Sequence, residues 1–121
     1  MYNLAVMYHK GKGVSQDYAK ARELYQKAAS AGNAFAMNNL GVIYDEARGV
    51  TQDYAKAREW YQKSADAGNA PAMYNLADLY ERGHGVTQDY AKARAWYQKA
   101  ANNGNPEAKE ALSRLASVQQ P

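Results

Sequence analysis

The strongest constraint in this sequence is that it repeats itself. The block Gln-Asp-Tyr-Ala-Lys-Ala-Arg occurs three times in the 121-residue chain, and each copy begins 36 residues after the one before it. A fixed period of this length is typical of arrays in which each unit cannot bury its own apolar face and stacks on a neighbour. The copies lie at residues 16–22, 52–58 and 88–94. The sequence therefore predicts a single solenoid over residues 1–121, without a central core.

Each unit is predicted to contain two helices. In the first helix of the middle unit, Leu40, Ile43 and Tyr44 recur with the spacing of one helical face. In the second, Tyr54 and Tyr61 alternate with alanines, which is typical of closely packed helices in which small residues admit large ones. The aromatic residues are therefore interpreted as core. The predicted fold class is all-α, a solenoid of antiparallel helix pairs. Unit 1 covers residues 2–37 and is incomplete at its amino-terminal side, unit 2 covers 38–73, unit 3 covers 74–109, and residues 110–121 belong to a capping helix that begins near Pro106.

Glycine and asparagine mark the junction between one unit and the next. A glycine suits the left-handed position that ends many helices, and an asparagine directly after it can cap the helix that follows. The sequence places such pairs at Gly32–Asn33, Gly68–Asn69 and Gly104–Asn105. These three sites are therefore predicted to be the turns between units.

Within each unit, a loop of the form Gly-x-Gly-Val separates the two helices, except that Ala47 stands where the other units have Gly11 and Gly83. Ala47 is expected either to bear about 1 kcal/mol of backbone strain or to extend its helix by one residue. Two kinds of residue compete to cap the second helix, and both possibilities stay open. They are the hydroxyl residues Ser15, Thr51 and Thr87, and the aspartates two positions later, Asp17, Asp53 and Asp89.

The order Leu-Gly or Leu-Ala, Tyr, Gly-x-Gly-Val, Gln-Asp-Tyr-x-Lys-Ala, Trp-Tyr-x-Lys-Ala-Ala and a closing Gly resembles the Sel1-like repeat, a relative of the tetratricopeptide repeat. The resemblance covers Tyr2 to Lys109 in three units. It implies a right-handed superhelix of helix pairs that serves as an adaptor or scaffold for protein complexes, often in bacteria. One subgroup carries paired cysteines in each unit. This chain has no cysteine, so the properties of that subgroup are not carried over.

In solenoids of helix pairs the first helices line the concave side, which is where a partner is expected. An asparagine recurs there in every unit, and a column of side-chain amides can hold an extended peptide backbone without selecting its sequence. An equally weighted alternative is that the asparagines bond to the neighbouring helix and fix the stacking. The column consists of Asn3, Asn39 and Asn75.

Other positions of the first helices differ from unit to unit, so packing alone does not dictate them. Together with the asparagines they are the candidate partner-binding residues: Val42, Asp45, Glu46, Tyr74, Asp78, Glu81 and Arg82. The four carboxylates among them suggest an acidic patch for a basic or amide-rich segment. Ordinary solvated charge is the favoured alternative.

The sequence offers no chemistry for catalysis. The two histidines, His9 and His84, occupy different positions of their units, and no hydrolase, nucleotide-binding or metal-binding motif is present. No enzyme activity, cofactor or metal site is therefore expected. The predicted function is a non-catalytic scaffold or adaptor that binds a peptide or protein segment on its concave face.

Two other functions are alternatives to this one. The net charge of +3 is modest, and most basic residues fall on the predicted second helices, so nucleic acid is not expected, although helical repeats that bind single-stranded RNA are the first alternative. The second alternative is a self-assembling module, because Leu4, Met7 and Tyr8 would form an unfinished apolar edge that could join copies in a homo-oligomer. This edge leads to the expectation that the chain is a fragment, an engineered chain or a self-associating one. No targeting segment or apolar run of membrane-spanning length is evident, and the compartment stays open between cytoplasm and periplasm.

Overall fold

The computed structural model describes residues 2–117, and these residues form seven α-helices and no strand. The helices are α1 (Tyr2–Lys10), α2 (Tyr18–Ser30), α3 (Ala34–Asp45), α4 (Tyr54–Asp66), α5 (Ala70–Arg82), α6 (Tyr90–Asn102) and α7 (Pro106–Ala116). The prediction of an all-α chain is therefore confirmed. The final part of the predicted capping helix, residues 118–121, lies outside the described residues.

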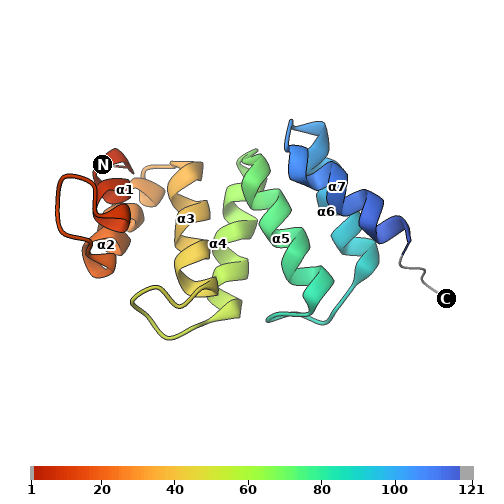
Figure 1. Cartoon of the computed structure of the whole chain (residues 1–121), viewed down its shortest axis with the longest axis horizontal. Coiled ribbons are helices and arrows are strands. Elements are labelled where there is room, and N and C mark those ends of the chain that lie inside the picture. Colours follow the sequence, from red (N-terminus) through yellow and green to blue (C-terminus); the bar gives the residue numbers. More distant parts are fainter. Residues whose placement is uncertain (1, 118–121) are drawn as a thin grey trace.

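The helices follow one another across the molecule in the order of the sequence (Figure 1). Each helix makes its main contacts with the helix before it and the helix after it. The buried residues accordingly form two clusters along the array, one centred on α1 to α3 and the other on α4 to α7. The absence of a single central core is what a stack of repeats requires.

The second helix of every unit begins at an aspartate. Asp17, Asp53 and Asp89 have extended backbone, and the Oδ1 atom of each accepts a hydrogen bond of 3.0 Å from the backbone amide three residues later. The carboxylate also lies at the positive end of the helix dipole. This geometry decides between the two candidate caps in favour of the aspartates.

The turns between units share one hydrogen-bonding pattern. At the first of them Gly32 has a φ of +93°, its amide donates to Ala29 at 2.9 Å, and the Asn33 amide donates to Ala28 at 3.0 Å. This pair of bonds is the Schellman motif, which a left-handed glycine permits. The side chain of Asn33 then accepts from the Ala36 amide at 2.9 Å and starts α3. The predicted glycine stops and asparagine caps are thus confirmed.

The loop inside unit 2 carries the one non-glycine residue with positive φ in the described chain. Ala47 has a φ of 55°, where Gly83 in unit 3 has 74°. Helix α3 ends at Asp45, so Ala47 adopts the left-handed conformation and does not lengthen the helix. Of the two expectations for this residue, backbone strain is the one the structure supports.

The core is built from tyrosines that interdigitate with alanines. Tyr25, Tyr61 and Tyr97 occupy the same position of successive second helices, and each is at most 1% exposed. Ala57, Ala93 and other alanines around them are fully buried. The interpretation of these aromatics as packing residues is therefore correct.

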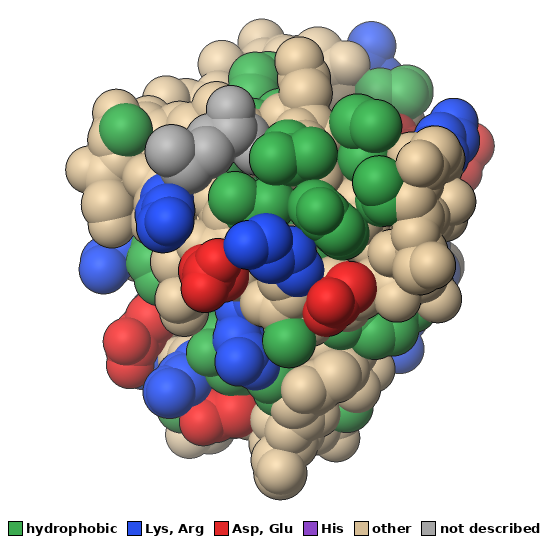
Figure 2. All heavy atoms as spheres, turned by 90° about the vertical axis from the view of Figure 1, so that its left-hand side faces the viewer, with side chains coloured by type: hydrophobic (Ala, Val, Ile, Leu, Met, Phe, Trp, Pro, Cys, Tyr) green, Lys and Arg blue, Asp and Glu red, His purple; other side chains and the backbone are tan. Residues whose placement is uncertain are grey.

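The two ends of the array differ in how well they are covered. Leu4 and Met7 on α1 are 42% and 38% exposed, whereas their counterparts in unit 2, Leu40 and Ile43, are fully buried. Viewed from that end, apolar side chains gather in the upper half of the face, above charged side chains of both signs (Figure 2). At the opposite end, α7 buries Leu115.

Candidate interaction surface

We use the name first-helix face for the exposed side of α1, α3 and α5, where the predicted partner-binding residues lie. The structure leaves all ten of these side chains at least partly accessible. Asn3, Glu46 and Arg82 are exposed, and the half-buried ones are Asn39, Val42, Asp45, Tyr74, Asn75, Asp78 and Glu81. On α3 and α5 the face is distinct from the buried side of the helices, where Leu40, Ile43, Leu76 and Leu79 are fully buried.

The asparagine column bridges neighbouring first helices. The Asn75 side-chain amide donates to the Asn38 Oδ1 atom at 2.9 Å, and the Asn39 amide donates to the Tyr2 hydroxyl at 3.3 Å. These contacts are those expected if the asparagines fix the stacking. Each amide carries two N–H groups and a carbonyl oxygen, so one such bond does not exhaust its capacity. That these amides also bind the backbone of a partner stays a prediction.

A second column joins the two layers of helices. In each unit the hydroxyl of the buried tyrosine on the second helix reaches a polar side chain 16 residues earlier, in the last turn of the first helix. The distances are 3.1 Å from Tyr25 to His9 Nδ1, 3.0 Å from Tyr61 to Asp45 Oδ2, and 2.7 Å from Tyr97 to Glu81 Oε1. We call these three contacts the tyrosine–acceptor pairs, after units 2 and 3, in which a carboxylate accepts from the tyrosine hydroxyl. They explain why this variable position is polar in every unit, because an unpaired buried hydroxyl would destabilise the fold.

In unit 1 the acceptor position is occupied by a neutral histidine. Arg48 lies 2.9 Å from His9 Nε2 through its Nη1 atom. Because a guanidinium can only donate, Nε2 must accept, and the ring proton therefore sits on Nδ1 and is donated to the Tyr25 hydroxyl. Burial, followed by the charge of Arg48, holds the pKa of His9 below its usual value. Burial raises the pKa of Tyr25 to about 12.

In unit 3 the acceptor is a carboxylate held by an arginine from the capping helix. Arg114 on α7 donates to both carboxylate oxygens of Glu81 through Nη1 and Nη2. Burial opposes ionisation of Glu81, but the hydrogen bonds from Arg114 and Tyr97 outweigh it, and its pKa lies below the ordinary value. Glu81 is therefore a charged, fully engaged group.

In unit 2 the acceptor has no such cation. Among the side chains of residues 2–117, only the Tyr61 hydroxyl bonds to the Asp45 carboxylate. Burial, together with the nearby charges of Asp78 and Glu46, raises the pKa of Asp45 above its usual value, even though Tyr61 and His84 act in the opposite direction. Asp78 is itself paired with Arg82, at 2.7 Å. The middle of the first-helix face thus carries excess negative charge.

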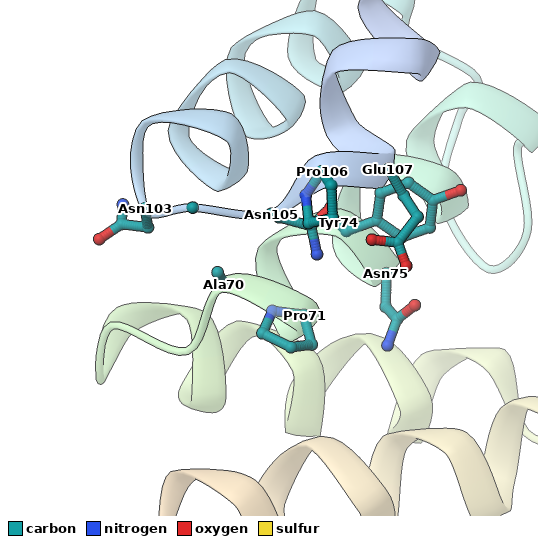
Figure 3. Close-up of a pocket in the computed structure, with 9 residues that line it drawn as sticks. Ala70, Pro71, Tyr74, Asn75, Asn103, Asn105, Pro106 and Glu107 are labelled. Carbon is teal, nitrogen blue, oxygen red and sulfur yellow. The ribbon is translucent and has the colours of Figure 1, made fainter.

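A hollow of about 530 Å³ borders this face at the start of α5 and α7. Its walls come from the first turn of α5 on one side and from the α6–α7 turn with the start of α7 on the other (Figure 3). It brings together two of the predicted residues, Tyr74 and Asn75, with Pro71, Asn103 and Glu107. Apolar rings beside amide and carboxylate groups suit a side chain of an extended segment.

The remaining chemistry of the described chain is sparse. No cluster of three or more histidine, aspartate or glutamate side chains in this part is arranged to hold a metal ion. None of the described helices has the length and apolar character needed to cross a membrane.

Sequence reasoning missed the partners of the acceptor position. From the sequence, Asp45 and Glu81 are expected in an acidic patch, without any link to Tyr61, Tyr97 or Arg114. The available signal was the constant spacing of 16 residues between each acceptor and a tyrosine that never varies.

The chain is similar to one known family and to several solved structures. The model of the Sel1 repeat matches residues 1–33, 34–69 and 70–105. No curated protein sequence matches significantly. Among solved structures, the chain is similar to c5321, a protective antigen of uropathogenic Escherichia coli strains that displays an SLR fold, with 42% identity and a TM-score of 0.92 over 97% of this chain and 25% of that one.

Two further solved structures are similar. A Sel1 repeat protein from Oxalobacter formigenes is 36% identical, with a TM-score of 0.84 over 88% of this chain and 44% of that one. Cysteine-rich protein B of Helicobacter pylori shares the fold, with 24% identity and a TM-score of 0.76 over 81% of this chain and 74% of that one. The chain thus spans well under two thirds of the first two. With three adjoining family matches and the same helical architecture, this chain belongs to the Sel1 repeat family.

Proposed function

We propose that this chain is a non-catalytic module that holds an extended segment of another protein on its first-helix face, the concave side of the solenoid. Sel1 repeats generally mediate protein interactions. The observation that carries the proposal is the accessibility of all ten candidate side chains on one face that runs across three consecutive units.

The chemistry of the face suits a peptide backbone. Asn39 and Asn75 present amides on neighbouring helices, and the hollow beside Tyr74 and Asn75 offers room for a side chain. Backbone groups of an extended segment can bond to such amides, while pockets between them select side chains. An RNA strand would instead meet Asp45, Asp78 and Glu81 on this face, which disfavours a nucleic-acid partner.

The test uses a peptide selected against the full chain from a display library, with its binding measured by calorimetry. Changing Asn39 and Asn75 together to alanine is expected to weaken binding by about 1 to 3 kcal/mol, because each removes hydrogen bonds at the interface. The matched control is Asn102→Ala, which removes an exposed amide from the second-helix layer. Circular dichroism checks that the double variant keeps its helices. An affinity unchanged by the double substitution would refute the role of the two asparagines.

A further inference from the structure

The acceptor residues of units 1 and 3 each contact an arginine of the same chain. In both outer units, an arginine that follows later in the chain reaches the acceptor of the tyrosine–acceptor pair. Arg48, 39 residues after His9, contacts its Nε2 atom at 2.9 Å. Arg114, 33 residues after Glu81, holds its carboxylate through two nitrogens. Two different places on the following unit thus bring a guanidinium to the partner of the buried tyrosine, a neutral imidazole in unit 1 and a carboxylate in unit 3.

Unit 2 has the same pair but neither arginine. The residue 33 positions after Asp45 is Asp78, and the residue 39 positions after it is His84. Asp78 bonds to Arg82, and the ring of His84 stacks on Tyr54 with 4.5 Å between ring centres. Neither supplies a cation in contact with Asp45, and Asp78 brings a second carboxylate to the site. The charge pattern of this one site is therefore complementary to a guanidinium.

We propose that the Asp45–Tyr61 pair, with Asp78 beside it, is a receptor for the guanidinium of an arginine in a bound protein segment. The inference rests on the proposed function, since it names the chemistry of the segment that the first-helix face holds. The Oδ2 atom of Asp45 accepts a hydrogen bond from the Tyr61 hydroxyl, and its Oδ1 atom can accept one from a further donor. A planar guanidinium presents several donors in fixed directions, which suits Asp45 Oδ1 with a second carboxylate nearby, whereas an ammonium donates from a single point. Arginine therefore fits the site better than lysine.

The raised pKa of Asp45 agrees with this assignment, because a carboxylate in a half-buried, negatively charged setting gains most from an added cation. The lowered pKa of Glu81, which already holds Arg114, shows the effect of such a cation in the neighbouring unit.

The experiment titrates the full chain with the blocked tripeptide acetyl-Ala-Arg-Ala-amide and follows the carboxyl carbon of Asp45 and the ring of Tyr61 by NMR. A matched peptide with citrulline in place of arginine has nearly the same shape without the charge. A saturable shift is expected with arginine alone, and it should weaken as salt is added. A lysine peptide is expected to bind about fivefold more weakly, because it cannot form the bidentate contact.

Two variants make the assignment specific. Asp45→Asn keeps an acceptor for the Tyr61 hydroxyl but removes the charge, and it should weaken arginine binding about fivefold or more. Asp78→Arg installs an internal arginine 33 residues after Asp45, the same offset as that of Arg114 from Glu81, and it should abolish binding by filling the site. Glu59→Gln, which removes an exposed carboxylate from α4 away from this face, is the control and should leave binding unchanged.

The outcomes separate the two proposals. Absent binding, equal shifts with the citrulline peptide, or unchanged binding by both Asp45→Asn and Asp78→Arg would overturn the arginine receptor. If library-selected peptides still bind and depend on Asn39 and Asn75, the interaction module stands without it. If only the arginine probe binds, the receptor stands and the extended-segment model fails.

Discussion

Units 2 and 3 share most of their residues, yet they pack the same tyrosine in different ways. In unit 2 the pair of residues four apart on the first helix is Gly41 and Asp45, and in unit 3 it is Ala77 and Glu81. A Cβ atom placed on Gly41 would lie 2.5 Å from the ring of Tyr61. The absence of a side chain at Gly41 leaves room for the Tyr61 ring beside α3, and the Tyr61 hydroxyl reaches the shorter Asp45 carboxylate at 3.0 Å. The comparison teaches that residues which vary between repeats vary as coupled sets.

The largest expected difference between the two units is the effect of deleting the acceptor. Glu81→Ala should lower the free energy of unfolding by about 3 kcal/mol, since it leaves a buried hydroxyl and Arg114 without their partner, and Asp45→Ala by about 2 kcal/mol, since it frees only the hydroxyl. Urea denaturation measures both. Tyr97→Phe in the Glu81→Ala background should restore part of the loss. Equal losses in the two units would contradict the comparison.

The coupling of the paired residues can be tested next. Gly41→Ala alone should destabilise the fold by about 1 to 2 kcal/mol, because the added methyl group overlaps the buried Tyr61 ring. In the Asp45→Glu background, which copies unit 3, that cost should largely vanish. Thermal unfolding of the two single variants and the double variant gives the interaction energy directly. Additive effects would show that the two positions are independent.

The loops within units 2 and 3 predict a smaller change in stability, and this change stabilises the protein. Ala47→Gly should stabilise the protein by about 1 kcal/mol, because it relieves the left-handed conformation that Gly83 adopts without strain. The greater freedom of glycine in the unfolded chain will offset part of this gain. The control is Ala55→Gly on the exposed side of α4, which should destabilise. A loss of stability in Ala47→Gly would refute the strain.

The smallest expected effect is a difference in pH dependence. The lowered pKa of Glu81 contributes stability that is present above its ordinary value of 4.5 and is lost as the pH falls through the folded pKa. The raised pKa of Asp45 has the opposite effect on stability. The free energy of unfolding falls as the pH rises from 3.8 through the pKa that Asp45 has in the folded protein. From pH 3 to pH 7, Glu81→Gln should therefore lose stability relative to the native chain and Asp45→Asn should gain it, each by less than about 1 kcal/mol. Urea midpoints across this range measure both, and parallel profiles would contradict the assignment.

The fold was predictable because its signals are local and repeated three times. Gly32 with Asn33, for example, specifies a helix end and a helix start within two residues, and the buried tyrosines recur at one phase of the period. Where two local signals competed, as for Thr51 and Asp53, the sequence could not decide, because both side chains can cap a helix.

The candidate surface was harder to predict because its chemistry depends on reach across helices. Whether Asp45 faces a partner or a tyrosine depends on how far the Tyr61 hydroxyl extends over the helix pair, and no local pattern encodes that distance. The same holds for Asn75, whose bond to Asn38 became visible only in three dimensions. The binding of a partner by these side chains stays a prediction.

The tyrosine–acceptor pairs have a consequence for how such arrays diversify. The residue that compensates each acceptor comes from the following unit. The net charge at an acceptor therefore depends on which two units adjoin, and not on one repeat alone. If units 2 and 3 exchanged places, Asp45 would precede the capping helix and meet Arg114, while Glu81 would face Val42 and Arg48. Shuffling whole modules would thereby remove the uncompensated negative site from the array without a single amino-acid replacement.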